Sequence, residues 1–559
     1  MKIERSVLFL IIIGFLIYFN GLFGSFVWDD EEQIVANGII HSIKNIPHLF
    51  LGSTFNPGGA SSLGGMYYKP LMSVSFSFLY SVFGSNPFFF HLFQLLIHIA
   101  NALLVFYFFK YFFNQKAAFF ASLFFLIHPV NSEAVLYVSA LQDTLFFFFG
   151  MLVMNLLKKG SGKISTVFLS AFFLLLSLLS KETGSLFFVV AIVFKFFFEK
   201  NKRFLYLFSF FIAGAIYLFL RFAVAGMSVG KFGPSPIMMA TFYERLINMP
   251  QIAFFYLKTF FWPASLAIDR QEIIREVSFY NFYLPLIFVL LFLSVTGTAL
   301  FLIYKRNGNN FKICLFFLLW FGLGMGLHLQ IFPLDMALAE RWFYFPIAGL
   351  LGLVLISGSQ FNLFNQKKLL YFFVILIIFA LSIRTFIRTF DWRNGLTLFS
   401  HDIKLSGKSF NLENNLGVGL FRTGRVEEAA IHFENSTKLA PYWWTNWNNL
   451  GVIYERQKDF ERAGKSYQKA IDNGKYYLAY ENLAGLFLNH KKSPKEAKEF
   501  IEKSLIDLPN NWKLHYILAL SELQLENREP AIQSARKAYQ LSPNEQTYRL
   551  LKNMATNSP

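Results

Sequence analysis

The residues best suited to chemistry in this sequence are four consecutive acids, Asp-Asp-Glu-Glu at positions 29–32. They follow the apolar segment Val7–Phe23, which is long enough to form a membrane-spanning helix. We therefore expect the acids at the membrane–water boundary, at the far end of that helix. Carboxylates are costly to hold beside hydrocarbon, so a group of them there indicates chemistry at one face of a membrane.

Further charged or polar residues occur at the ends of later apolar segments. A carboxylate can remove a proton from an acceptor hydroxyl, while lysine and arginine can bind a phosphate leaving group. Because a lipid-linked phosphate would enter from the bilayer, the pattern favours transfer of a group from a lipid phosphate to a hydroxyl. Isolated charges near a span more often snorkel or pair, so the hypothesis depends on their shared membrane face. The candidate residues are Asp29, Asp30, Lys69, His128, Glu133, Asp143, Lys181, Arg221, Glu340 and Arg341.

Other chemistries lack their sequence signals. The chain has no phosphate-binding Walker lysine loop, no dinucleotide-binding glycine fingerprint and no HExxH zinc motif. Its single cysteine, Cys314, excludes a cysteine-rich metal site. Asp29 and Asp30 could hold Mg²⁺ or Mn²⁺, because hard cations take carboxylate ligands. Adjacent side chains rarely point the same way, however, so we assign no metal ligands.

The composition indicates a membrane domain followed by a polar one. Of 559 residues, 55% are hydrophobic and only 15% are charged. We predict a membrane domain over 1–390, a linker over 391–409 and a polar domain over 410–559. The net charge of +17 is better explained by basic cytoplasmic loops and contact with anionic lipid than by nucleic-acid binding.

Basic clusters between the apolar segments set the predicted topology. Placing them all in the cytoplasm gives a consistent path of about 11–13 spans. The acidic loop and the whole chain after residue 385 are then exofacial. Residues 71–83 and 242–262 are assigned to interfacial or re-entrant helices. The predicted spans lie near 6–23, 88–109, 117–131, 139–157, 164–180, 183–199, 203–221, 279–304, 311–329, 341–358 and 368–385.

The polar region repeats with a period of 34 residues, the length of a tetratricopeptide repeat. The pair Leu416-Gly417 recurs at Leu450-Gly451, and alanines recur in register. We predict four repeats and a capping helix, so the whole chain is expected to be all-α. Such a solenoid forms a groove that suits a peptide or protein partner. Trp443, Trp444 and Trp447 are candidate acceptor-binding residues, and packing of their rings is an equally good interpretation.

The order of these motifs resembles a known family over nearly the whole chain. The chain is similar to membrane glycosyltransferases of the C superfamily, and in particular to the transmembrane and tetratricopeptide-repeat-containing O-mannosyltransferases. The matching residues are Trp28-Asp29-Asp30, Tyr68-Lys69-Pro70-Leu71, His128-Pro129 with Glu133-Ala134-Val135, Ser180-Lys181-Glu182, Tyr256-Leu257-Lys258 to Pro263 ahead of Asp269, and Glu340-Arg341.

The resemblance implies a membrane bundle of the glycosyltransferase C type and an inverting sugar transfer. The donor would be a polyprenyl-phosphate sugar and the acceptor a hydroxyl, such as a protein Ser or Thr, on the exofacial side. Asp29 or Asp30 would be the base, and the sequence leaves the choice open. The resemblance assigns supporting roles to Glu133, Asp143, His128 and Glu340, and phosphate binding to Lys181, Arg341, Lys69 and Arg221.

Two features depart from the family pattern. The acidic group is larger than the pair that the family needs, so Glu31 and Glu32 are expected at the surface. The array of four repeats is short, and the bias toward Phe, Lys and Asn is typical of a bacterial protein. We expect a multi-pass protein of the bacterial inner membrane, or of the endoplasmic reticulum in a eukaryote. If the protein is bacterial, the family resemblance is a weaker guide to the sugar (mannose) and to the acceptor (a protein).

Two other classes of protein could share this pattern. A non-enzymatic membrane scaffold would use its repeats to gather partners for envelope assembly, with its exofacial charges scattered and solvated. A transporter would place its charges near the middle of the membrane. A glycosyltransferase instead requires Asp30, Lys181 and Arg341 within reach of one substrate.

Overall fold

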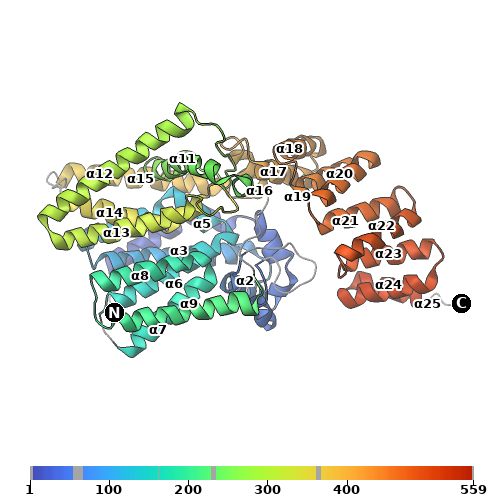
Figure 1. Ribbon diagram of the computed structural model, residues 1–559, viewed down its shortest axis with the longest axis horizontal. Helices are drawn as coiled ribbons and strands as arrows, with labels where there is room; N and C mark the ends of the chain where they lie inside the picture. The colour runs from blue at the N-terminus through green and yellow to red at the C-terminus, as the bar shows by residue number, and fades with distance from the viewer. Residues whose placement is uncertain (1–3, 55–66, 161–162, 228–234, 361–366, 557–559) are drawn as a thin grey trace. The chain divides into compact units, whose positions relative to one another are not determined.

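The computed structural model describes residues 4–54, 67–160, 163–227, 235–360 and 367–556. Within these ranges every regular element is a helix, which confirms the predicted all-α class. The described chain divides into two compact units, one ending at Gly407 and the other beginning at Lys408. Figure 1 labels the helices of both units.

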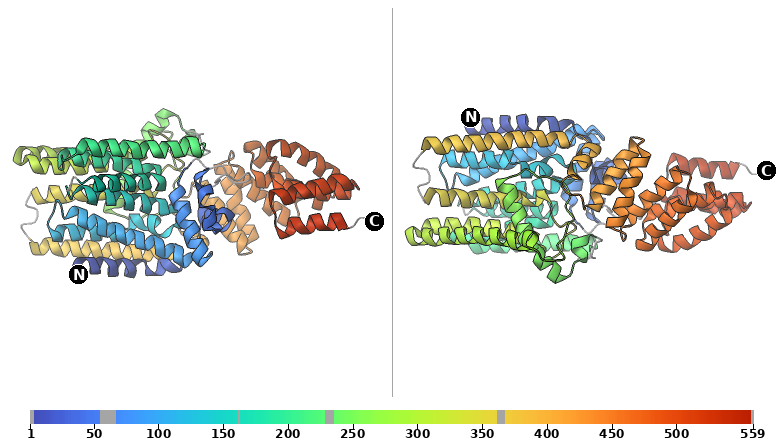
Figure 2. Two further views of the ribbon diagram at one scale, coloured as in Figure 1. Left: turned by 90° about the horizontal axis from the view of Figure 1, so that it is seen from below. Right: turned by 90° about the horizontal axis from the view of Figure 1, so that it is seen from above.

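The N-terminal unit is a bundle of long apolar helices that lie side by side (Figure 2). Its helices are α1 (Arg5–Tyr18), α2 (Pro70–Phe83), α3 (Pro87–Phe109), α4 (Gln115–Ile127), α5 (Ser132–Leu136), α6 (Leu141–Leu157), α7 (Ile164–Ser180), α8 (Ser185–Phe197), α9 (Arg203–Phe219), α10 (Pro236–Met239), α11 (Phe242–Phe261), α12 (Leu284–Arg306), α13 (Gly308–His328), α14 (Pro346–Gln360), α15 (Lys367–Asp391) and α16 (Gly395–Asp402). The predicted linker, 391–409, thus contains helix α16.

Fewer helices than expected are long and apolar enough to cross a membrane. Among the described residues seven helices pass this test, and an eighth does if the bent pair Gln115–Ile127 and Pro129–Leu136 is one span. The sequence indicated about 11–13. Three apolar helices are shorter, among them α7 with 17 residues. A perpendicular span needs about 17–25 residues, so α7 lies at the lower limit of that range and α2, with 14 residues, falls below it.

Aromatic side chains fill the centre of this bundle. Trp320 of α13 is fully buried, and its ring lies 5.9 Å from Phe108 and 5.7 Å from Phe187. Glycines let the neighbouring helix α14 approach α13 closely. A Cβ at Gly349 would lie 2.5 Å from the backbone nitrogen of Phe321. Small residues at helix crossings are the usual means of packing membrane helices closely.

Short helical turns at one end of the bundle contain or adjoin several of the predicted site residues. The loop after α1 leads into the π-helical turn η2 (Glu31–Val35). Pro129 breaks the chain between α4 and α5, whose paired segments are bent by 49°. The other turns are η5 (Pro129–Asn131), η6 (Val138–Ala140), η7 (Glu182–Gly184), η8 (Leu220–Val224) and η10 (Glu340–Tyr344).

The C-terminal unit is the predicted tetratricopeptide-repeat solenoid. The recurring glycine packs against the aromatic ring of its own repeat, because a Cβ at Gly417 would lie 2.8 Å from Phe433. The recurring alanines 429, 463, 497 and 531 are fully buried where paired helices cross. Helix α25 follows the fourth pair, where a cap was expected. The helices are α17 (Phe410–Arg422), α18 (Val426–Leu439), α19 (Trp444–Arg456), α20 (Phe460–Asn473), α21 (Tyr477–Asn489), α22 (Pro494–Asp507), α23 (Trp512–Gln524), α24 (Arg528–Leu541) and α25 (Glu545–Thr556).

Candidate active site

Asp30 is fully buried and serves as a local anchor. Its two carboxylate oxygens accept hydrogen bonds from the backbone N–H groups of Val27 (3.0 Å) and Ser139 (2.7 Å). These bonds tie the turn after α1 to η6, more than one hundred residues away. Burial raises the pKa of Asp30 to about 7, although the hydrogen bonds from Ser139 and Val27 oppose this change.

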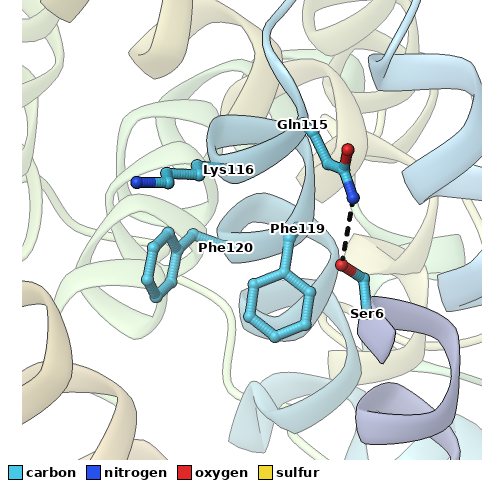
Figure 3. Close-up of a pocket in the computed structure, with 5 residues that line it drawn as sticks. All are labelled: Ser6, Gln115, Lys116, Phe119 and Phe120. Atoms are coloured by element: carbon cyan, nitrogen blue, oxygen red, sulfur yellow. Dashed lines mark hydrogen bonds between the residues drawn. The ribbon is translucent and has the colours of Figure 1, made fainter. Parts of the chain in front are cut away.

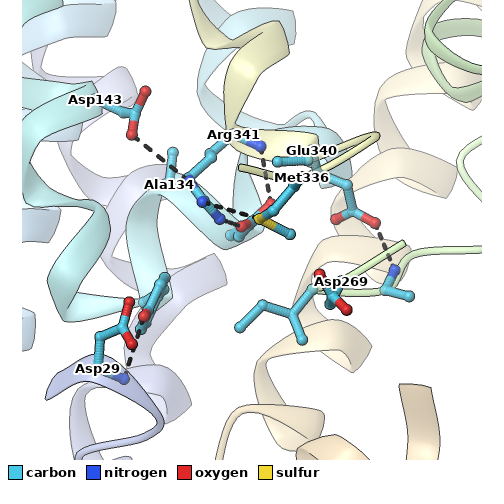
Figure 4. Close-up of polar contacts among 12 residues, drawn as sticks. Asp29, Ala134, Asp143, Asp269, Met336, Glu340 and Arg341 are labelled. Carbon is cyan, nitrogen blue, oxygen red and sulfur yellow. Dashed lines mark hydrogen bonds and ion pairs between the residues drawn. The ribbon is translucent and has the colours of Figure 1, made fainter. Parts of the chain in front are cut away.

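Asp29 is partly exposed, and its side chain is not used as an anchor (Figure 4). Its backbone N–H donates to the Tyr137 hydroxyl at 3.3 Å. Burial raises the pKa of the Asp29 carboxyl, while a hydrogen bond with Tyr137 and the charges of Arg341 and Lys69 lower it. Asp29 therefore shares an electrostatic environment with two predicted phosphate-binding residues. Glu32 is exposed and Glu31 is partly exposed, as expected for surface residues of the loop.

The two aspartates do not form a shared cation site. Asp30 directs both oxygens at backbone N–H groups, whereas the charges of Arg341 and Lys69 act on Asp29. Within the described ranges no three His, Cys, Asp or Glu side chains are grouped as metal ligands. Both oxygens of Asp30 are thus already engaged, and the chemistry considered below uses side chains alone.

Four charges of alternating sign, from Glu133, Arg341, Asp143 and Lys181, form a chain in which only Arg341 is partly exposed; Figure 4 labels Asp143 and Arg341. Glu133 of α5 forms an ion pair with the Arg341 guanidinium and accepts the Arg341 backbone N–H at 2.9 Å. Arg341 Nε lies 4.0 Å from Asp143 Oδ2 of α6, and the other oxygen of Asp143 lies 2.5 Å from Lys181 Nζ. Buried charges are tolerable only when they are paired in this manner. The structure thus joins four predicted residues from four elements.

Lys69 and Arg221 lie close to this chain but differ in their partners. Arg221 pairs with Glu182 at 2.7 Å and hydrogen-bonds to Tyr217. Lys69 is 8% exposed, and its Nζ lies 4.1 Å above the Tyr67 ring. Burial lowers the pKa of Lys69 to about 8, with Glu182 opposing and Lys181 reinforcing the change. In the described part of the chain, no carboxylate lies within ion-pair distance of Lys69.

Glu340 and His128 are engaged with backbone groups of neighbouring segments. Oε1 of Glu340 accepts the Ala267 backbone N–H at 2.6 Å, and the buried carboxyl has its pKa raised to about 8. His128 is fully buried. Its Nδ1 accepts the Val130 N–H, and its Nε2 lies 3.0 Å from the Phe260 carbonyl oxygen. The structure uses both residues to fasten neighbouring segments, so it does not bring them into the cluster around Asp29.

Sequence reasoning missed two residues of this cluster, Tyr137 and Asp335. Tyr137 contacts Asp29, and Asp335 contributes to the electrostatics of Asp29, Lys69 and Arg341. Both lie in loops that were predicted to be exofacial, 131–138 and 330–340. The signal that could have identified Tyr137 and Asp335 is that each is a polar side chain in one of these loops.

The three tryptophans of the repeats pack within their own unit. The Trp443 and Trp444 rings stack at 4.9 Å, and Trp443 also contacts Phe410. Trp447 Nε1 donates to the Pro441 carbonyl at 2.7 Å, while Lys469 lies 4.1 Å above its ring. All three rings are half-buried. Their predicted role in acceptor binding remains a prediction.

A separate pocket lies at the starts of α1 and α4 (Figure 3). Gln115 Nε2 donates to Ser6 Oγ there at 3.5 Å. None of the residues that line it belongs to the predicted site, so this pocket is not the candidate active site. The lining residues are Ser6, Gln115, Lys116, Phe119 and Phe120.

The fold and the charge cluster together define a class: a membrane helix bundle with a buried polar site, joined to a tetratricopeptide-repeat solenoid. A tetratricopeptide-repeat family model matches residues 445–473. Over 586 residues the chain is 24% identical to the human protein O-mannosyl-transferase TMTC3, covering 93% of this chain and 62% of that protein. The *Caenorhabditis elegans* protein O-mannosyl-transferase F38B6.6 is 27% identical over 455 residues, which cover 78% of this chain and 63% of that protein. The resemblance expected from the motifs is confirmed.

The chain spans about three-fifths of the length of these curated relatives. Among solved structures it is similar to MamA from *Desulfovibrio magneticus* RS-1, with 21% identity and a TM-score of 0.24. That match covers 26% of this chain and 84% of the solved one. The solenoid assignment therefore depends on the repeats themselves and not on this neighbour.

Proposed function

We propose that this protein is a membrane glycosyltransferase that moves a sugar, mannose or a similar hexose, from a polyprenyl-phosphate donor to a protein Ser or Thr hydroxyl. The names of the relatives support sugar transfer to protein, and the charge cluster supports a phosphate-linked donor. The observation that carries the proposal is the position of Asp29. This partly exposed carboxylate faces the charges of Arg341 and Lys69 from two other elements.

Asp29, and not Asp30, is the proposed base. A general base must reach the proton of the acceptor hydroxyl, so at least one carboxylate oxygen must be accessible. Both oxygens of Asp30 accept backbone N–H groups, and the side chain has no exposed surface. Asp29 retains exposed surface, and the charges of Arg341 and Lys69 lower the pKa of its carboxyl.

The proposed reaction is a single displacement at the anomeric carbon of the donor sugar. The Asp29 carboxylate takes the proton of the acceptor hydroxyl while the hydroxyl oxygen forms a bond to that carbon. The bond from the anomeric carbon to the phosphate oxygen breaks, and its electron pair leaves with the polyprenyl phosphate. Lys69 and Arg341 would stabilise the charge that develops on this leaving group.

The site is proposed to face the exofacial side of the membrane, where the repeats would recruit the protein acceptor. The basic clusters at 158–163, 195–203 and 305–312 belong to the opposite side by the positive-inside rule. In this arrangement the bundle would contact membrane lipid and would bind the polyprenyl-phosphate donor from the bilayer. We propose a multi-pass location in a bacterial inner membrane, or in the endoplasmic reticulum of a eukaryote.

The charge pattern favours an enzyme over the two other classes. In a scaffold, charged side chains that only solvate the ends of the helices would be scattered and exposed. Glu133, Asp143 and Lys181 are instead buried and joined through Arg341. The cluster also gathers on terminal turns and loops, whereas a transporter would hold its charges at mid-membrane.

The test is sugar transfer by the purified full-length protein from a polyprenyl-phosphate mannose to a Ser/Thr-rich peptide. Asp29→Asn should lower the rate at least roughly 100-fold, because it removes the base. Glu32→Gln, which changes an exposed acid of the same loop, is the matched control and should stay near the wild-type rate. Wild-type transfer rates in Asp29→Asn would contradict the assignment of the base. Absence of transfer by the wild-type protein with any polyprenyl-phosphate sugar would contradict the proposed function.

A further inference from the structure

Tyr137 occupies the centre of the contacts around Asp29. It lies between α5 and η6, and its side chain is buried. Its hydroxyl accepts the backbone N–H of Asp29 at 3.3 Å, and the same hydroxyl lowers the pKa of the Asp29 carboxyl. The Arg341 guanidinium carbon lies 6.0 Å from the centre of its ring. One tyrosine thus contacts both the proposed base and a proposed phosphate-binding residue.

We propose that Tyr137 is a positioning residue, whose hydroxyl holds Asp29 in the orientation that proton removal requires. This inference rests on the proposed function of Asp29 as the base. It adds a residue that neither the motifs nor the relatives' names indicate. Tyr137 itself is not required to touch the substrate.

The hydrogen-bonding capacity of the hydroxyl fits this role. A tyrosine hydroxyl has one proton to donate and can accept at the same time. By accepting the Asp29 N–H, it keeps its own proton available for the Asp29 carboxyl. A hydrogen bond donated to a carboxylate stabilises the charged form. Burial and the negative charges of Asp29 and Asp30 raise the pKa of Tyr137 well above its usual value, so it remains a neutral donor.

Other charged groups around Asp29 either raise or lower the pKa of its carboxyl. Arg341 from η10 and Lys69 from the start of α2 favour the ionised carboxyl, while Asp335 from the loop before η10 opposes it. Asp30 lies next in the chain and also carries a carboxyl. Burial is the largest influence and favours the neutral form, and the Tyr137 hydrogen bond is the largest opposing one. Removing the hydroxyl should therefore protonate Asp29 at a higher pH.

The Tyr137 ring is held firmly enough to orient its hydroxyl. The Trp28 ring stacks on it at 6.2 Å and 22°, and the buried Trp392 ring lies 6.1 Å away. Trp28 has a φ of +51°, a conformation that costs a non-glycine residue free energy. The turn that presents Asp29 therefore also places the Trp28 ring on Tyr137.

The first experiment measures the pH dependence of sugar transfer by the full-length protein. Tyr137→Phe removes only the hydroxyl, and it should move the acidic limb of kcat up by roughly one pH unit. The donor KM should change less than about threefold, because no donor contact is lost. Tyr256→Phe is the matched control: this buried tyrosine also stacks on an aromatic ring, and its hydroxyl donates to the Ala339 carbonyl at 2.9 Å. Its acidic limb should stay at the wild-type pH. An unmoved limb in Tyr137→Phe would overturn the inference.

A second experiment does not require activity. Thermal unfolding in detergent is compared for the wild type, Tyr137→Phe, Asp29→Ala and the double variant. If the two side chains interact, the loss of Tm in the double variant should be smaller than the sum of the single losses. Additive losses would overturn the inference even if the enzyme is active. Coupled losses without any transfer by the wild type would overturn the proposed function while supporting the contact between Tyr137 and Asp29.

Discussion

Lys69 differs from the other basic residues of the cluster in having no ion-pair partner among the described residues. Lys181 pairs with Asp143, and Arg341 pairs with Glu133. With its pKa lowered to about 8, Lys69 is charged below that pH and loses its charge as the pH rises through it. An incoming phosphate would supply the missing partner. Lys69 is therefore the residue whose contribution to donor binding should depend most on pH.

For the wild type, we expect the donor KM to rise as the pH increases from about 7 to about 9, because neutral Lys69 no longer attracts the phosphate. Lys69→Gln should raise the donor KM roughly tenfold or more at the lower pH. Lys69→Arg stays charged throughout and should show a flat profile over the same range. Initial rates at varied donor concentration measure these values. A flat wild-type profile would show that Lys69 does not contact the donor.

The residue types of the charge cluster could be listed from the sequence, but their pairings could not. Asp29 and Asp30 are adjacent, and nothing local distinguishes them. They differ because Asp30 contacts Ser139, which is 109 positions away. Glu133 and Arg341 are 208 positions apart. Such contacts depend on how the helices pack, which a single sequence does not specify.

At the scale of helices, close approach between α13 and α14 depends on small residues. Gly349 faces the backbone of Phe321, and Gly352 faces the ring of Phe317. The pair spans one helical turn of α14, so both lie on the side that meets α13. These helices lead into and out of the segment that contains Arg341. The distance between α13 and α14 therefore affects the position of Arg341 and of the charge cluster to which it belongs.

Gly349→Ala should destabilise the bundle by about 1–3 kcal/mol, because the new Cβ overlaps a backbone that cannot move alone. Gly322→Ala in α13 is the matched control, since a Cβ there has nothing within 4 Å. That variant should leave the apparent Tm equal or slightly higher, as alanine favours helices over glycine. Thermal unfolding in detergent measures both. Equal Tm values for the two variants would contradict this account of the crossing.

At the scale of the whole molecule, the two-part organisation follows from composition and periodicity. Hydropathy marks the membrane bundle, and the 34-residue period marks the solenoid. The number of spans was less predictable. Apolar segments such as Ile164–Ser180 look alike in sequence whether they cross a membrane completely or only in part, and this helix has a length at the lower limit for a span.

The sidedness of the chain can be tested by cysteine labelling in intact cells. The native Cys314 is fully buried and should react little with a membrane-impermeant maleimide. Ala36→Cys in the acidic loop and Glu461→Cys in the repeats should be labelled from outside. Lys116→Cys should be labelled only after the cells are opened, because basic loops stay in the cytoplasm. Labelling of Glu461→Cys and Lys116→Cys from the same side would contradict the predicted topology.

The register of the repeats limits how this chain could lengthen or shorten during evolution. In the first two repeats of the solenoid, the glycine packs on the aromatic ring of its own repeat (Gly417 on Phe433, Gly451 on Tyr467), and buried alanines recur at the same position in all four repeats. Since repeats contact mainly their neighbours, duplication or loss of one whole repeat leaves every remaining contact type intact. An insertion of any other length inside a helix would rotate its glycine away from the ring it must meet. The number of repeats is therefore expected to change by whole repeats during evolution.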